Sequence, residues 1–309
     1  MPMIKHGSIG FHLALVPRLA GMTGPNRGMT KTIPLFCILY FVLCIFIFFF
    51  NFLFMFYPLL NLSGYIFMIV FNALAIIIPL GGMTTKELSD KYDSLFTPIA
   101  FTFSIWSVIY TLLLVFVIVG VINLIRGKRK KNSLIDQRIG WLFWITCLFN
   151  GGWMIAWQYQ YVGLSVIIML GFLITLIRLY TEIRRNTNHL NTADKYISLP
   201  AFSIYLGWIS VATIANISAW LISIQWSAWG ISPVTWTIIM IVIATLLGLI
   251  MLAKNRDVFF TLVILWALYG IMSKRISVDP VEFASIITTT QICMAFLVGT
   301  MTGKFFIKK

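Results

Sequence analysis

The sequence predicts an all-α protein, a polytopic transmembrane helix bundle. Of its 309 residues, 60% are hydrophobic and only 10% are charged, and the mean hydropathy is +0.94. Soluble proteins have about 25% charged residues, so a core of this size could not hide so much apolar surface from water. The apolar residues form long runs, without the alternation of apolar and polar residues over roughly ten positions that marks a transmembrane β-barrel. The composition therefore favours helices in a bilayer.

The apolar runs approach or exceed the length of about 20 residues that a helix needs to cross a bilayer. They cover approximately residues 33–57, 62–80, 99–125, 139–158, 162–181, 199–222, 235–253, 257–272 and 283–303. No Asp, Glu or Lys lies near the centre of a run, and Arg178 lies near enough to one end for its stem to reach the interface. We expect each run to be a spanning helix, with the first run as the uncertain case.

Residues 1–61 are expected to be an N-terminal tail with one possible extra span, 33–57. Length favours a span, but a span would place the cations of the tail outside, against the positive-inside rule. A signal peptide is not expected, because the run is longer than the usual apolar region and no small-residue cleavage site follows it. A tight turn is predicted before the next helix from Pro58, Asn61, Ser63 and Gly64.

The remaining loops alternate in charge. Lys and Arg gather in loops 126–138 and 182–198, at Lys254 and Arg256, and in the C-terminal tail, whereas 159–161 and 223–234 contain neither. Loop 81–98 mixes both signs, and 273–282, with Lys274 and Arg275, is a mild exception. The positive-inside rule then predicts a multi-pass protein of the cell membrane whose C-terminus and loops 126–138 and 182–198 are cytoplasmic. The net charge of +14 follows from these loops, and no basic stripe interleaved with aromatics suggests nucleic-acid binding.

Neither a metal centre nor an enzyme is expected. The cysteines lie inside apolar segments without a CxxC pair, and the histidines lie in the N-terminal region or a loop: Cys37, Cys44, Cys147, Cys293, His6, His12 and His189. There is no HExxH motif, no His–Ser–Asp set and no carboxylate pair within the bilayer. Asp257 and Glu282 lie at helix ends and are expected to face the interface.

Eight of the eleven tryptophans divide into two groups. Those near the ends of runs fit the aromatic belt of membrane proteins: Trp141, Trp144, Trp226, Trp229 and Trp236. Trp106, Trp153 and Trp208 lie deeper, and Trp106 is eight residues after Pro98, or about 12 Å into its helix. Because hydrocarbon cannot satisfy an indole N–H, these three rings should face the bundle interior, another helix or a bound molecule.

Helical spacing places the deep tryptophans beside other aromatic and amide side chains. Residues three or four apart share a helix face, which groups Trp106 with Tyr110. The other two stripes are Asn150, Trp153 and Trp157, and Tyr205, Trp208, Ala212 and Asn216. Polar and small residues also join helices in membranes without binding anything. A shared aromatic pocket and simple helix packing both remain open from these stripes.

At these stripes the sequence resembles the TspO/MBR family, the tryptophan-rich sensory proteins related to the translocator (peripheral benzodiazepine receptor) protein. The second helix of that family follows a proline pair and has a Trp eight residues later and a Tyr four residues after that Trp. Here Pro98, Trp106 and Tyr110 have the same spacing, and Thr97 replaces the first proline. The third family helix carries Asn-x-x-Trp, like Asn150 and Trp153. The fifth carries Tyr-Leu-x-Trp with Ala and Asn following, matched by Tyr205, Trp208, Ala212 and Asn216.

The resemblance covers residues 62–222 and implies a five-helix core, with 235–303 as three additional transmembrane helices. In the family, the first, second and fifth helices and the loop after the first enclose a pocket for porphyrins and other flat hydrophobic ligands. Carried over, it implies a ligand-binding set of Pro98, Trp106, Tyr110, Asn150, Trp153, Tyr205, Trp208, Ala212 and Asn216. The family's Trp-Tyr near the end of its first helix is missing here, and Pro200 lies five residues before Tyr205 instead of beside it.

The leading functional hypothesis is a membrane receptor or sensor that binds a planar hydrophobic ligand, with a tetrapyrrole as a candidate. The ligand would stack on Trp106 and Trp208, and Asn150 would orient a polar edge of it. The alternative is a facilitative transporter for a small hydrophobic molecule, since no ionisable residue for ion coupling lies at membrane depth. Breakdown of porphyrin by the pocket is a third, weaker option. The bilayer and a small hydrophobic ligand are the expected partners, and a homodimer is left open.

Overall fold

The computed structural model describes Tyr40 and residues 57–78, 80–83, 85–126, 134–188 and 192–306. The predicted first span, 33–57, lies outside these residues except for Tyr40 and Tyr57, as do Cys37, Cys44 and all three histidines. Residues Phe52–Lys309 form one compact unit. Within the described part, eight helices are long and apolar enough to cross a membrane, and there is no strand. The all-α membrane class is confirmed.

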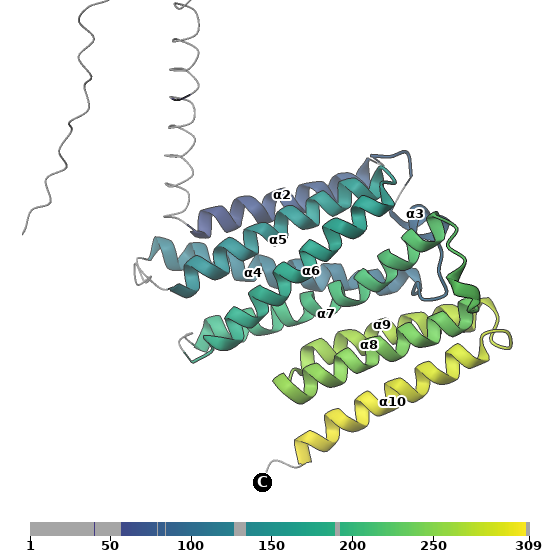
Figure 1. Cartoon of the computed structure of the whole chain (residues 1–309). Helices are drawn as coiled ribbons and strands as arrows, with labels where there is room; N and C mark the ends of the chain where they lie inside the picture. Colours follow the sequence, from purple (N-terminus) through teal and green to yellow (C-terminus); the bar gives the residue numbers. More distant parts are fainter. Residues whose placement is uncertain are drawn as a thin grey trace, which may run out of the picture. The chain divides into compact units, whose positions relative to one another are not determined.

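The spanning helices carry the labels of Figure 1. They are α2 (Tyr57–Ile77), α4 (Ile105–Ile125), α5 (Leu134–Gln158), α6 (Val162–Arg185), α7 (Thr192–Ser223), α8 (Pro233–Asn255), α9 (Val258–Val278) and α10 (Ala284–Phe306). Between them lie the short helix α3 (Thr85–Lys91) and the 3-10 helices η1 (Ala100–Ser104) and η2 (Ala228–Gly230). Successive spanning helices run in opposite directions, so that α2, α5, α7 and α9 all end at the side where α3 lies (Figure 1). We call this side the α3 end.

Five helices form a closed ring. Helix α2 packs against α4 and α5, α5 packs against α6, α6 against α7, and α7 closes the ring against α4. These are the five helices that the resemblance assigned to the core. Helices α8, α9 and α10 pack against one another, and α9 joins this group to the ring through α7 and η1 (Figure 1). The boundary between the predicted domains stays a prediction.

The predicted turn at Pro58, Asn61, Ser63 and Gly64 is wrong, because all four lie in the first turns of α2. Proline is tolerated there, since the first N–H groups of a helix have no intrahelical partner. Gly64 is buried where a Cβ would lie 2.9 Å from Cδ1 of Trp144 on α5. In a membrane, small residues let helices approach closely, so this glycine marks a helix contact and not a chain reversal.

Several other helices differ from their predicted runs at their ends, α4 and α7 among them. The run 99–125 begins with η1, and α4 itself starts at Ile105, so Trp106 lies in the first turn of α4 and not well inside an α-helix. Helix α7 starts at Thr192 and continues through Pro200. Spanning helices tolerate an internal proline because neighbouring groups can satisfy the carbonyl that it leaves free.

Asp257 does not face the interface, in contrast to the prediction, whereas Glu282 is exposed as expected. The Asp257 carboxylate caps α9 by accepting the N–H of Phe260 at 3.0 Å. It also accepts the hydroxyls of Tyr180 on α6 and Ser203 on α7, each at 2.5 Å. This buried carboxylate therefore ties the start of α9 to two helices of the ring.

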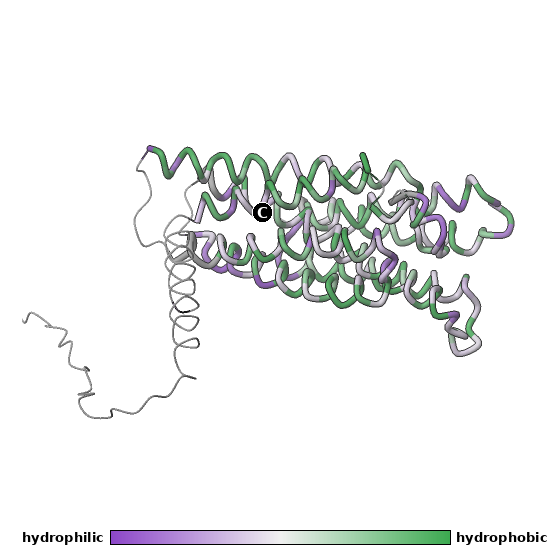
Figure 2. Tube along the Cα trace, turned by 90° about the horizontal axis from the view of Figure 1, so that it is seen from above, coloured by the Kyte–Doolittle hydropathy of each residue, from purple (hydrophilic) through white to green (hydrophobic). Residues whose placement is uncertain are grey.

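The two ends of the bundle differ in charge. Figure 2 shows hydrophobic residues along most of the helices and hydrophilic segments at both ends. The α3 end carries the mixed charges of 81–98 and 273–282, and Lys274 there pairs with Asp93 (Nζ to Oδ1, 2.7 Å). The opposite end carries more cations than anions, and its cations include Arg126, Arg184, Arg185, Lys195, Lys254 and Arg256. The chain is a multi-pass membrane protein, and its orientation stays a prediction.

Candidate functional site

A pocket lies inside the ring at the α3 end. Its wall is formed by side chains from α3 and the segment after it, η1, α4, α5 and α7: Ser89, Tyr92, Thr97, Pro98, Phe103, Trp106, Trp153, Trp157, Trp208, Val211, Ala212, Ala215, Asn216 and Ala219. The lining is mostly apolar, and the pocket has a volume of about 80 Å³. The pocket is partly open and not sealed.

Four tryptophans, which we call the indole layer, dominate the wall: Trp106, Trp153, Trp157 and Trp208. Trp106 meets Trp208 edge to face at 6.2 Å between ring centroids, and Phe103 also meets Trp208 edge to face, at 5.8 Å. Trp153 and Trp157 stack at 6.0 Å on α5. Edge-to-face and offset contacts at such distances are favourable, so the indole layer is a packed surface contributed by three separate helices.

The indole layer contains two donors that the protein leaves unused. The N–H groups of Trp157 and Trp208 are buried, and no acceptor among the described residues bonds to either of them. Leaving a buried donor unpaired costs about 1–3 kcal/mol. Both tryptophans are among the residues that line the pocket.

Trp153 differs from these two, because its indole donates a hydrogen bond to Oδ1 of Asn216 at 3.0 Å. The amide nitrogen of Asn216 in turn donates to the hydroxyl of Ser165 on α6 at 2.9 Å. This chain of bonds joins α5, α6 and α7 beside the pocket. The Trp153 and Asn216 stripes of the sequence thus meet across two helices.

A second set of side chains lies one helical turn deeper than the pocket. Tyr110 follows Trp106 by one turn on α4, which runs away from the α3 end. Asn150 and Tyr205 precede Trp153 and Trp208 on α5 and α7, which run toward it. With Asn72 of α2 they make the amide–phenol layer: Asn72, Tyr110, Asn150 and Tyr205.

The amide–phenol layer is a continuous hydrogen-bonded network. Tyr110 donates to Oδ1 of Asn72 at 2.8 Å, and Nδ2 of Asn72 donates to Oδ1 of Asn150 at 2.6 Å. Nδ2 of Asn150 then donates to the hydroxyl of Tyr205 at 3.0 Å. Each amide uses its oxygen and its nitrogen within the network, as polar groups at membrane depth require. These groups lie beneath the lining residues as a floor, and none of the four lines the pocket itself.

Below this floor three phenylalanines close the ring. Phe116, Phe143 and Phe202 come from α4, α5 and α7 and meet edge to face at centroid distances of 5.0 to 5.8 Å. Phe143 and Phe202 are fully buried. We call this the phenylalanine layer, and its rings fill the space among α4, α5 and α7 at this depth.

A comparison with models of known protein families gives one result that covers most of the chain. Residues 58–303 match the model for a TSPO-like protein. The chain belongs to the TSPO-like protein family. The match extends through α8, α9 and α10, beyond the region 62–222 to which the sequence motifs confined the resemblance. No curated protein and no solved structure matches the chain.

The TSPO-like motifs converge in space, but not all of them at the pocket. Six of the nine predicted ligand-binding residues line it: Pro98, Trp106, Trp153, Trp208, Ala212 and Asn216. Tyr110, Asn150 and Tyr205 lie in the amide–phenol layer, and Asn150 is 1% exposed with its amide fully engaged. The role expected for Asn150, orienting a ligand directly, therefore has no support from its position.

Sequence reasoning missed several lining residues of this TSPO-like pocket. Trp157 belongs to the Trp153 stripe but was not assigned to the site. Its N–H is unpaired, in contrast to that of Trp153. Tyr92 and Phe103 come from the segment between the first two helices of the ring and had no family motif to mark them. In the described structure α2 contributes no lining residue, whereas α5 supplies two, so the enclosing helices are the second, third and fifth of the ring.

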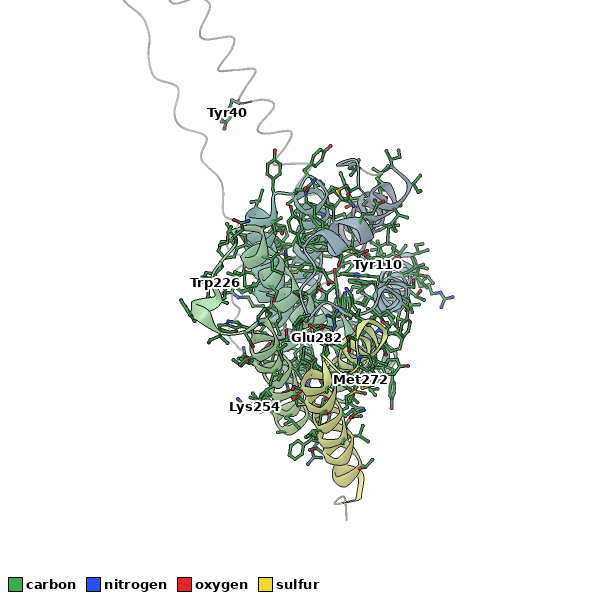
Figure 3. All side chains as sticks on the ribbon, turned by 90° about the vertical axis from the view of Figure 1, so that its right-hand side faces the viewer. Tyr40, Tyr110, Trp226, Lys254, Met272 and Glu282 are labelled. Carbon is green, nitrogen blue, oxygen red and sulfur yellow. The ribbon has the colours of Figure 1, made fainter. Side chains whose placement is uncertain are left out.

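Five other tryptophans, those predicted for the aromatic belt, lie elsewhere in the TSPO-like fold. Trp226, Trp229 and Trp236 contact one another at the connection between α7 and α8, and Trp226 lies at the edge of the bundle in Figure 3. Trp141 stacks on Trp144 at 5.6 Å on α5. Tyr110, also labelled in Figure 3, belongs to the interior network instead. The predicted division of the tryptophans into an interfacial belt and a deep group stays a prediction.

Proposed function

We propose that this TSPO-like membrane protein binds a flat, largely apolar ligand that carries a hydrogen-bond acceptor on its edge. The observation that carries the proposal is the pair of buried N–H groups of Trp157 and Trp208 in the pocket wall. The indole faces supply stacking, and the unused donors select a carbonyl, ether or carboxylate over a plain hydrocarbon. The protein acts as a receptor or binding protein and not as an enzyme.

The size of the pocket limits the ligand. Its volume of about 80 Å³ is smaller than the cavity of about 150 Å³ that holds benzene in a well-studied engineered protein. A ligand of two fused rings needs a modest opening of the wall or extends partly outside it. A tetrapyrrole would need a much larger movement of the segment that contains Thr97 and Pro98, so the smaller ligand class is the one that we favour.

A binding role fits the layers better than a transport role. A molecule moving from the pocket toward the opposite end would have to break the bonds among Asn72, Asn150 and Tyr205 and then separate Phe143 from Phe202. Each buried polar group left unpaired on the way would cost about 1–3 kcal/mol. Facilitated passage therefore needs a conformation that differs in both layers.

The acceptor can be tested with two ligands of nearly equal shape. Coumarin carries a carbonyl and a ring oxygen, whereas naphthalene has the same two fused rings and no acceptor. For purified protein in detergent we expect coumarin to bind about two- to tenfold more tightly than naphthalene, because one net hydrogen bond is worth about 0.5–1.5 kcal/mol. In the double variant Trp157→Phe/Trp208→Phe this preference should disappear, since phenylalanine keeps an apolar ring but has no donor.

The control is Trp229→Phe, which changes an indole that is 76% exposed and does not line the pocket. It should keep the wild-type preference. If wild-type protein binds coumarin and naphthalene equally, the proposed use of the two donors is wrong.

The tetrapyrrole candidate has its own test. Protoporphyrin IX is titrated against wild type, Trp106→Ala and Trp208→Ala, and its absorbance is followed so that the loss of a tryptophan does not alter the signal. Binding in the pocket requires both alanine variants to weaken the affinity at least tenfold. Equal affinity in all three proteins would place the porphyrin elsewhere.

A further inference from the structure

One wall of the pocket rests on a helix that does not line it. The segment 93–103, between α3 and α4, contributes Thr97, Pro98 and Phe103 to the lining. In the structure as described, no lining residue comes from α8, α9 or α10. Nevertheless α9 packs along η1 and contacts this segment at several points.

Hydrogen bonds fix the segment 93–103 to α9 at three heights along the helix. The N–H of Ile99 donates to the carbonyl of Gly270 at 3.0 Å. The indole of Trp266 donates to the carbonyl of Thr102 at 2.9 Å. Near the end of α9, Lys274 pairs with Asp93. Two of these bonds involve the backbone of the segment, so they define its position and not merely that of its side chains.

Ring contacts strengthen the same interface. Phe101 meets the ring of Trp266 edge to face at 4.8 Å and that of Tyr269 at 6.2 Å. Phe101 thus lies on α9 while Phe103, two residues later, lies against Trp208 in the pocket. The 3-10 helix η1 therefore presents one aromatic ring to α9 and one to the ligand site.

Gly270 makes the close approach possible. A Cβ at this position would lie 2.1 Å from Oγ1 of Thr102 and 3.0 Å from Cβ of Pro98. Real Cβ atoms do not approach other atoms to 2.1 Å, and Thr102 is fully buried, so it has little room to move. Any larger residue at position 270 must push away the segment that carries Pro98.

We infer that α9 positions the wall of the pocket formed by Thr97, Pro98 and Phe103, with Gly270 as the positioning residue. The C-terminal helices then set the ligand affinity of a site to which they contribute no lining side chain. This inference rests on the proposed function for its effect on binding, but the contact itself can be measured without a ligand.

The test compares Gly270→Val with Gly299→Ala, a change on α10 where a Cβ has no described neighbour within 4 Å. Amide hydrogen exchange is measured over residues 94–104, and coumarin affinity is measured on the same preparations. Gly270→Val should raise the exchange of the Ile99 amide at least tenfold and weaken coumarin binding at least fivefold. Gly299→Ala should change neither.

Trp266→Phe serves as a second variant if Gly270→Val does not fold. It removes the donor to Thr102 while keeping a ring beside Phe101, and we expect a two- to tenfold rise in exchange at residues 99–104. Unchanged exchange in both variants would overturn the inference, as would faster exchange with unchanged coumarin affinity. If wild type binds no coumarin but exchange still rises, the proposed function fails while the positioning of the segment by α9 stands.

Discussion

The indole N–H of Trp153 and the amide oxygen of Asn216 are 3.0 Å apart and join α5 to α7 at the wall of the pocket. The same Asn216 amide bonds Ser165 on α6, so a single side chain holds three helices of the ring together. This residue both lines the pocket and fixes the spacing of the helices that form it.

Replacing Asn216 with alanine should destabilise the protein by about 1–2 kcal/mol. The change leaves the Trp153 N–H and the Ser165 hydroxyl without their partner, although side-chain bonds in membranes average below 1 kcal/mol each. Reversible unfolding in mixed detergent would measure the loss. Thr300→Val is the control, because this exposed hydroxyl bonds only the carbonyl of Phe296 in its own helix and should matter little.

The amide–phenol layer should show coupling between Asn72 and Asn150. Their side chains share a 2.6 Å hydrogen bond between α2 and α5. In a double-mutant cycle with alanine at each position, the interaction energy should lie between about 0.6 kcal/mol, the average for such bonds in a membrane protein, and about 1.7 kcal/mol, the maximum. Strictly additive losses would mean that the two amides act independently and that the layer is not one network.

Asp257→Ala should be the most destabilising of the polar changes, at about 2–4 kcal/mol. It removes the cap of α9 and leaves the hydroxyls of Tyr180 and Ser203 without an acceptor. The matched change is Asp279→Ala, which removes a carboxylate that caps the exposed turn before α10. Water can replace that carboxylate, so the loss should be below about 1 kcal/mol. Equal losses in thermal unfolding would contradict the buried role of Asp257.

Two neighbouring glycines on α5 give a direct test of helix packing. A Cβ at Gly151 would lie 2.5 Å from the ring of Phe67 on α2, whereas a Cβ at Gly152 has no described neighbour within 4 Å. Gly151→Ala should therefore cost about 1–3 kcal/mol by overpacking. Gly152→Ala should be neutral or stabilising by up to about 1 kcal/mol, because alanine is the better helix former. Thermal unfolding in detergent would distinguish the two.

The spanning helices were predictable because a bilayer imposes both their length and their composition. Errors arose at residue types that usually mark a turn or a loop in soluble proteins but that helices of membrane proteins also contain. Pro58 and Gly64 suggested a turn but lie within α2, and Lys274 and Arg275 suggested a loop but lie within the last turns of α9. Helix α9 therefore extends to Val278, beyond the predicted end at 272.

For the site, the sequence was informative about faces but not about depth or partners. Periodicity correctly grouped Trp208 with Asn216, yet it could not show that the side-chain amide of Asn150 forms hydrogen bonds with Asn72 and Tyr205. Asn72 had no motif, although an amide in the middle of an apolar run is itself a sign of a polar partner. The partners of Asp257 lie on α6 and α7, far away in the sequence, so no local pattern could show its burial.

The closed ring has a consequence for the order in which the protein is made. Helix α4 lies between α2 and α7, but α5 and α6 separate it from α7 along the chain. During synthesis Trp106 therefore enters the membrane well before Trp208, and its face of α4 stays open to lipid, or to whatever assists insertion, until α7 arrives. A ribosome that stalls after α6 would leave α2, α4, α5 and α6 without α7, so that Nδ2 of Asn150 has no Tyr205 hydroxyl to which it can donate. The arrival of α7 therefore closes the ring and supplies the last partner of this buried amide in one step.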